Sequence, residues 1–181
     1  MLQARGEGAA RNETTVERTS DRELVVTRMF NGPAHIVFDA WTKPELLKRW
    51  WAPKSFGVSL FECESDLRVG GTYRYAFGRD PEKPEVFSGR YIAVSPPSRL
   101  VLTQLYERMR NAGEAVVTAT FEESQGRTRL TLHQLFPSKE ALDGAIASGM
   151  EHGMRETLDQ LDALVALTGS DMVVDGGVSN V

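Results

Sequence analysis

The sequence contains a single cysteine, Cys63, so it cannot form an internal disulfide. Its first residues lack the continuous apolar segment of a secretory signal, and no run of about 20 apolar residues predicts a transmembrane helix. These absences exclude the disulfide-stapled secreted class and the membrane-spanning class. We therefore expect a cytoplasmic protein that does not bind a membrane.

Clustered positive charge is also missing. Lys and Arg number 21 against 25 Asp and Glu, which gives a formal net charge of −4, and the basic residues are scattered among acidic ones. A surface that binds nucleic acid needs Lys and Arg gathered on one face, because the phosphate backbone dominates affinity. No nucleic-acid partner is expected.

The spacings typical of metal sites are absent. The three histidines, His35, His133 and His152, lie far apart, and neither a C-x-x-C nor an H-E-x-x-H motif occurs. His152 and Glu156 share a helix face at a spacing of four residues, but this spacing is more typical of a solvated ion pair. We predict no metal site.

Catalytic motifs are equally scarce. No G-x-S-x-G elbow marks a serine nucleophile, and Cys63 lies between Glu62 and Glu64, which cannot lower its pKa. Gly70-Gly71 lacks the spacing of a phosphate loop. The sequence therefore assigns no catalytic residue and no cofactor.

The 181 residues, 41% of them hydrophobic, suit one globular domain with a sizeable core. Residues 1–19 are polar and lack apolar periodicity, so we predict a flexible N-terminal arm. Turn residues punctuate 168–181, which we predict to be a flexible tail. The folded domain is expected to occupy residues 20–167.

Alternating apolar and polar residues predict a series of half-buried strands joined by short turns, which is typical of an antiparallel meander. Pro33 and Pro44 each mark the start of a short helix, and the second helix should end near Trp50. The strands are predicted at residues 23–30, 73–77, 87–94, 100–105, 115–121 and 128–135.

One long amphipathic helix should follow the last strand. Ser138 can cap it, and apolar residues recur at helical spacing from Leu142 to Val165. A break is expected between Gly144 and Gly149, because glycine weakens a helix. A sheet with one apolar face must bury that face, so the helix should cover it. The predicted fold class is α+β, with a curved antiparallel sheet around the C-terminal helix.

Four segments in order resemble the START-like (SRPBCC) superfamily, in the branch related to the C-terminal domain of the activator of Hsp90 ATPase. They are residues 28–53, the D-x-R-x-G-G hairpin at 66–75, 89–100 and 149–164. The resemblance covers roughly residues 22–167. It implies a helix-grip (START-like, Bet v-like) fold with a pocket between the long helix and the sheet. Many relatives carry Trp where this chain has Met154.

Aromatic, sulphur-containing and inward polar side chains could line such a pocket, or could pack against one another as ordinary core; both interpretations stay open. Strand parity places Gln134 inward and His133 on the opposite face, and Gln104 could orient a ligand by hydrogen bonding. The predicted ligand-binding residues are Trp50, Trp51, Phe56, Tyr73, Tyr75, Phe87, Leu102, Gln104, Phe121, Met150 and Met154.

The first functional hypothesis is a protein that binds a small apolar or amphipathic ligand. An enzyme of the aromatase/cyclase kind is an alternative, in which Tyr73 or Tyr75 would donate a proton. The third hypothesis is a co-chaperone-type interaction module, as the resemblance implies. A homodimer and a contact with a chaperone both stay open.

Overall fold

Eight antiparallel strands form one curved sheet in the computed structural model, which describes residues 12–174. Their order across the sheet is β1-β2-β8-β7-β6-β5-β4-β3, so β3 to β8 form a meander and β2 closes it beside β8. The strands are β1 (Thr15–Arg18), β2 (Glu23–Phe30), β3 (Ser59–Ser65), β4 (Thr72–Gly78), β5 (Glu85–Ser95), β6 (Arg99–Tyr106), β7 (Ala115–Ser124) and β8 (Arg127–Leu135).

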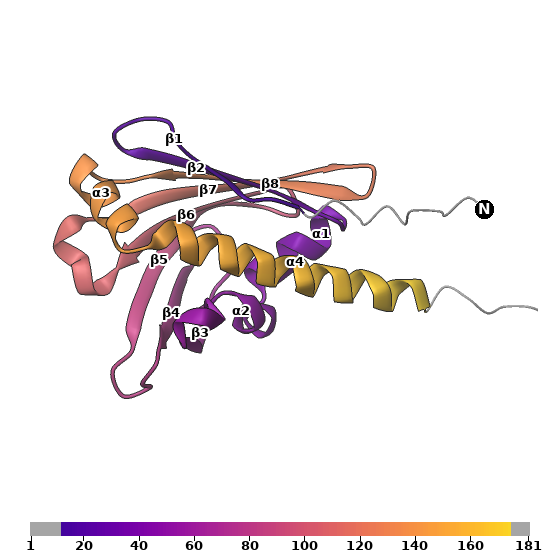
Figure 1. The fold of residues 1–181 in the computed structure, drawn as a ribbon, viewed down its shortest axis with the longest axis horizontal. Helices are drawn as coiled ribbons and strands as arrows, with labels where there is room; N and C mark the ends of the chain where they lie inside the picture. Colours follow the sequence, from indigo (N-terminus) through magenta and orange to yellow (C-terminus); the bar gives the residue numbers. More distant parts are fainter. Residues whose placement is uncertain (1–11, 175–181) are drawn as a thin grey trace, which may run out of the picture.

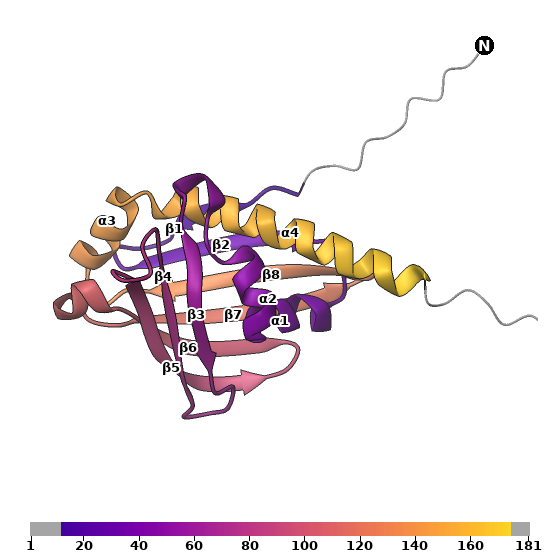
Figure 2. The ribbon, with the colours of Figure 1, turned by 90° about the horizontal axis from the view of Figure 1, so that it is seen from below.

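The sheet curls round one long helix, α4, as Figures 1 and 2 show. Two short helices connect β2 to β3 at the positions that Pro33 and Pro44 predict. The α+β helix-grip fold and the antiparallel meander are thus confirmed. The helices are α1 (Ala34–Thr42), α2 (Pro44–Trp50), η1 (Lys54–Phe56), η2 (Glu107–Ala112), α3 (Lys139–Ala147) and α4 (Met150–Val174).

The break in the C-terminal helix lies where the glycines predict it. Ser138 caps α3 by accepting a hydrogen bond from the Ala141 amide at 3.0 Å. α3 ends before Ser148, and Gly149 adopts a φ of +85°, in the left-handed region that favours glycine. The chain turns at this residue, so α4 can cross the sheet in a direction of its own.

Regular secondary structure extends beyond the predicted domain at both ends. Thr15–Arg18, part of the predicted arm, form β1 and pair with β2, and α4 continues past residue 167 to Val174. β1 is too short for its alternation to be read from sequence, and its tertiary contacts stabilise it. Residues 1–11 and 175–181 of the predicted arm and tail lie outside the described residues.

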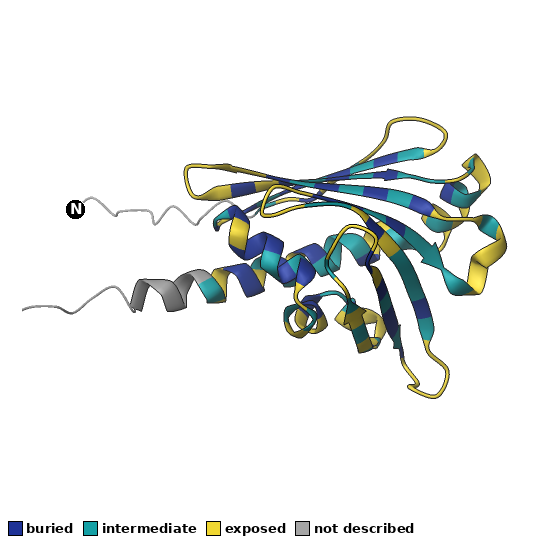
Figure 3. Cartoon of the chain, turned by 180° about the vertical axis from the view of Figure 1, so that it is seen from behind, coloured by how far each residue is buried: buried dark blue, intermediate teal, exposed yellow. Residues whose placement is uncertain are grey.

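The core lies between the concave face of the sheet and α4. Buried positions in Figure 3 gather where α1 and α4 face the sheet. On α4 the side chains of Leu158, Leu161 and Val165 are almost fully buried, at the spacing of one helix face. Within the part of the chain that the structure describes, no helix combines the length and hydrophobicity needed to span a bilayer.

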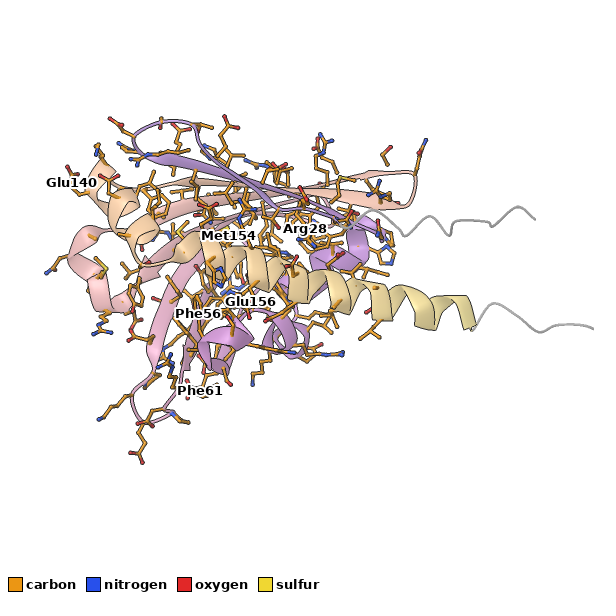
Figure 4. The ribbon with its side chains drawn as sticks, in the orientation of Figure 1. Arg28, Phe56, Phe61, Glu140, Met154 and Glu156 are labelled. Atoms are coloured by element: carbon orange, nitrogen blue, oxygen red, sulfur yellow. The ribbon has the colours of Figure 1, made fainter. Side chains whose placement is uncertain are left out.

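A buried arginine fixes α4 to the sheet. Arg28 lies on the inward face of β2 and is 2% exposed, and its guanidinium pairs with Asp159 at 2.6 Å and Asp162 at 3.1 Å. It also donates to the Thr14 hydroxyl at 2.9 Å, which ties the segment before β1 to the same point. A buried charge needs such partners, because desolvation is costly. Figure 4 shows Arg28 and Phe56 on opposite sides of α4.

Candidate functional site

The predicted site residues divide into groups with different surroundings. Trp50 and Phe121 belong to a packed aromatic cluster with Trp41 and Phe38. The Trp41 ring lies 5.2 Å from Trp50 and 6.3 Å from Phe121, and Phe38 lies 5.4 Å from Phe121. The Trp50 indole N–H donates to the Ala40 carbonyl at 2.9 Å. These side chains fill the interior beneath α1.

A second group forms a continuous surface that we call the aromatic wall: Trp51, Tyr75, Phe77, Phe87 and Tyr106. Trp51 meets Tyr75, Phe77 and Phe87 edge-on at centroid distances of 5.5, 5.1 and 5.9 Å. Phe77 and Phe87 stack at 5.6 Å, and Phe87 contacts Tyr106 at 5.1 Å. Tyr75 is buried, but the other four rings are only half-buried. Solvent therefore reaches this part of the concave face.

The prediction omitted Phe77 and Tyr106, although the sequence carries a sign of each. Phe77 continues the period-two series of Tyr73 and Tyr75, and Tyr106 follows Gln104 by two residues. The register confirms that each lies on the inward face, since Tyr75 pairs with Phe87 and Phe87 pairs with Tyr106. The alternation of side chains along each strand was therefore sufficient to predict that Phe77 and Tyr106 face inward.

Tyr73, next to the aromatic wall, stabilises the sheet where the pairing of β5 and β6 is interrupted. The β5–β6 pairing is interrupted between Ser88 and Tyr91, and the Tyr73 hydroxyl reaches across this gap to donate to the Thr103 carbonyl at 2.6 Å. Gly89 leaves the room for it, because a Cβ there would lie 1.9 Å from the Thr103 oxygen and 2.8 Å from the Tyr73 ring. The Tyr73 hydroxyl proton is thus already used in a hydrogen bond to the backbone.

Burial keeps the interior tyrosines protonated. It raises the pKa of Tyr73 and of Tyr75 well above the ordinary phenol value, and it also raises the pKa of Tyr91, whose hydroxyl lies 2.7 Å from the Ser65 hydroxyl. Burial also raises the pKa of the Cys63 thiol to about 11. A raised pKa makes each group a weaker acid, which disfavours Tyr73 and Tyr75 as proton donors.

At the Tyr106 end of the aromatic wall, the Glu85 carboxylate is paired with two neighbouring side chains. The Tyr106 hydroxyl donates to Glu85 at 2.6 Å, and Arg108 donates to the other carboxylate oxygen at 2.6 Å. Burial and the neighbouring Glu85 raise the pKa of Tyr106. Glu85 therefore offers no unpaired charge to a ligand.

The loop that carries Trp51 is held against α4 by two polar side chains. Gln160 donates to the carbonyls of Trp50 and Ala52, both at 2.8 Å. Glu156 accepts from the Ser55 amide at 2.7 Å and from its hydroxyl. These bonds fix the backbone on both sides of Trp51, and so they position its ring over the sheet.

Phe56 lies on the outer side of this loop. Its ring stacks on His152 at 5.6 Å with an interplanar angle of 25°, and it is 37% exposed. Figure 4 shows Phe56 beside Glu156, on the loop side of α4. Phe56 is therefore separate from the aromatic wall, whereas Met154, one turn before Leu158 on the buried face of α4, packs against the core.

The contact between Glu156 and the loop should depend on pH. Hydrogen bonds from the Ser55 hydroxyl and amide lower the pKa of the Glu156 carboxyl below its ordinary value of 4.5. A lowered pKa in the folded state means that the contact is fully present above pH 4.5 and is lost as pH falls through the lower value. We expect the Ser55 amide to lose hydrogen-exchange protection there, after correction for intrinsic rates. Glu156→Gln should remove this pH dependence, and a persisting dependence would assign it elsewhere.

Three other predicted residues belong to neither aromatic group. Met150, Leu102 and Gln104 are half-buried, and Met150 and Leu102 pack against the core. His133 lies on the convex face, as parity predicts, with its Nε2 atom 2.8 Å from Glu23. Among the described residues, no group of three or more His, Cys, Asp or Glu side chains could hold a metal ion.

Two hollows lie away from the aromatic wall. One, of about 220 Å³, is bounded by Arg28, Asn31, Asp159 and Asp162. The other, of about 420 Å³, lies around Arg74, Arg90 and Gly89. Both are rimmed by paired charges, since Arg74 binds Glu62 and Arg90 lies near Glu114. Most of the residues that line them are polar or charged, in contrast to the rings of the aromatic wall.

The family model described as "Activator of Hsp90 ATPase homolog 1-like protein" matches residues 31–166. The chain belongs to this family. The match confirms the resemblance drawn from the four sequence segments, and the helix-grip fold agrees with it. No curated protein matches the chain.

Solved structures of similar proteins support the assignment to the Activator of Hsp90 ATPase homolog 1-like family. A Rhodobacter sphaeroides protein is 28% identical with a TM-score of 0.78, over 86% of this chain and 99% of its own. A Staphylococcus epidermidis protein is 29% identical with a TM-score of 0.71, over 85% and 94%. A Nitrosomonas europaea protein is 25% identical with a TM-score of 0.72, over 84% and 99%.

Proposed function

We propose that this member of the Activator of Hsp90 ATPase homolog 1-like family binds a small apolar or amphipathic molecule against the aromatic wall. The observation that carries the proposal is the half-exposure of Trp51, Phe77, Phe87 and Tyr106 on the concave face. A closed core would bury these rings. Left accessible, they form the largely aromatic surface that small-molecule sites use.

Burial of apolar surface supplies the energy for binding at the aromatic wall. Removing about 100 Å² of apolar surface from water contributes roughly 2.5 kcal/mol, and a ligand that covers several rings would remove more. The rings are already held in place by their mutual contacts and by the loop that Gln160 and Glu156 fix to α4. Little conformational entropy is therefore lost on binding.

Binding of the neutral dye N-phenyl-1-naphthylamine tests the proposal. Tyr75→Ala should weaken binding about tenfold, because it removes a ring of the wall, and Met154→Ala should weaken it about threefold. Arg110→Ala, an exposed change in η2, should leave the affinity unchanged. The measurement is a fluorescence titration at fixed protein concentration.

Thermal stability must be measured on the same variants, because truncating a packed side chain also costs about 2 to 5 kcal/mol of folding stability. A large loss of stability with unchanged dye affinity would support ordinary core packing and count against the proposal. If the dye does not bind the wild-type protein, that result would also count against the proposal.

The family description favours a second candidate, a domain that contacts an Hsp90-type chaperone. Its test is whether the purified protein changes the ATPase rate of such a chaperone. A changed rate that persists in a variant unable to bind the dye would separate the two candidates.

A further inference from the structure

We infer that the ligand of the aromatic wall carries an uncharged, hydrogen-bonding head group, and that Gln104 and Gln134 recognise it. The inference rests on the proposed function and names the chemical class of its ligand. It starts from the side-chain amides of these two residues on the concave face, which hydrogen-bond to none of the described residues.

Gln134 is the more deeply placed of the two. It lies on the inward face of β8, paired with Leu24 on one side and Val117 on the other, and it is only 8% exposed. Side-chain atoms that are both sealed from solvent and unpaired occur, among the described residues, only in Asn12, Arg28 and Trp41. The Gln134 amide therefore keeps contact with solvent although nearly all of the residue is buried.

Gln104 lies across the sheet from it. Gln104 pairs with Ala115 on β7, and Val117, two residues further along β7, pairs with Gln134. Two strand spacings and two residue rises place the two Cα atoms about 12 Å apart. Ala115 lies on the inward face between them and leaves space for a ligand group. Tyr106, the end of the aromatic wall, follows Gln104 on the same face of β6.

A glutamine side chain with no protein partner supplies both a donor and an acceptor, and a ligand that displaces the water there must replace those hydrogen bonds. A matching head group would offer the complementary pair, as a carboxamide, or a hydroxyl beside a carbonyl, does. Gln160 shows the contrast, because both of its amide atoms are used to hold the Trp51 loop. The two concave-face glutamines have no such structural partner among the described residues.

Charge on the concave face explains why the head group should be neutral. The inward positions of the sheet carry four charged residues: Arg18, Arg28, Glu85 and Glu123. Arg18 is paired with Asp143, Arg28 with two carboxylates, and Glu85 with Arg108. Glu123 accepts a hydrogen bond from the backbone amide of Ala34, at the start of α1. A charged head beside Gln134 would lose its hydration without gaining a counter-ion.

Three naphthalene probes that differ only in the head group test the inference: naphthalene, 2-naphthamide and 2-naphthoate. We expect 2-naphthamide to bind about five- to tenfold more tightly than naphthalene, since one or two neutral hydrogen bonds are gained. The carboxylate of 2-naphthoate should weaken binding at least tenfold relative to 2-naphthamide. Isothermal titration calorimetry gives all three affinities.

The matched variants are Gln104→Leu and Gln134→Leu, which keep the side-chain size and remove the amide. Each should reduce the advantage of 2-naphthamide while leaving naphthalene binding unchanged or tighter, which also shows that the variant is folded. Equal binding of the three probes, or an advantage that both variants retain, would overturn the inference and leave the proposed function standing. Binding of none of the probes would overturn both.

Discussion

Replacing Gly89 with alanine should lower the free energy of unfolding by about 3 kcal/mol, the upper range for an overpacked site. A Cβ at this position would lie 1.9 Å from the Thr103 carbonyl oxygen, which is backbone and cannot turn aside. It would also displace the Tyr73 ring, whose hydroxyl satisfies that carbonyl. One methyl group would therefore cause a steric clash and break a buried hydrogen bond.

Gly144→Ala is the matched control. Gly144 lies inside α3, and nothing stands within 4 Å of the position that its Cβ would occupy. Alanine there should raise stability by up to about 1 kcal/mol, because it favours the helix. Denaturant titrations of the two variants measure both effects. Equal midpoints for Gly89→Ala and the wild-type protein would contradict the packing described around Tyr73.

Trp51→Ala should weaken binding of N-phenyl-1-naphthylamine about 30-fold, which corresponds to roughly 2 kcal/mol at an aromatic hot spot. Trp51 contacts three other rings of the aromatic wall, so its loss removes the largest single surface and loosens the others. The measurement is the same fluorescence titration, with thermal unfolding followed in parallel.

Phe56→Ala provides the comparison for Trp51→Ala. Phe56 belongs to the same loop and is also aromatic, but it stacks on His152 outside the wall. Its truncation should change the dye affinity by less than about twofold, within the range of energetically neutral contacts. If the two truncations weaken binding equally, the site lies elsewhere or the loop acts as a whole.

Local patterns predicted much of the fold. Alternation between residues 23 and 30 delimited β2, because each inward side chain there is buried and each outward one is partly exposed. Pro33 before α1, Pro44 as the first residue of α2 and Gly149 before α4 marked boundaries that depend on backbone geometry alone.

Features that depend on tertiary contacts could not be predicted in this way. β1 has only four residues, and it is tied down through Thr14, which binds Arg28 and also accepts a hydrogen bond from Arg155. The burial of Arg28 is invisible in sequence, since its two carboxylate partners lie more than 130 residues away.

The candidate site shows the same limit. Parity predicted which side chains face inward, but it could not say how deep each lies along the concave face. Trp50 and Trp51 are neighbours in sequence, yet one fills the core under α1 and the other joins the aromatic wall. Gln134 was predicted to face inward, and only the surrounding contacts show that its amide lacks a partner.

Methionine methyl signals give the most direct test of the claim that the ligand binds at the aromatic wall. In protein labelled with ¹³C at the methionine methyls, 2-naphthamide should shift the signal of Met154 and show contacts between its ring protons and that methyl. Met29, on the outward face of β2, should not respond. A saturating probe that leaves Met154 unchanged would contradict the account.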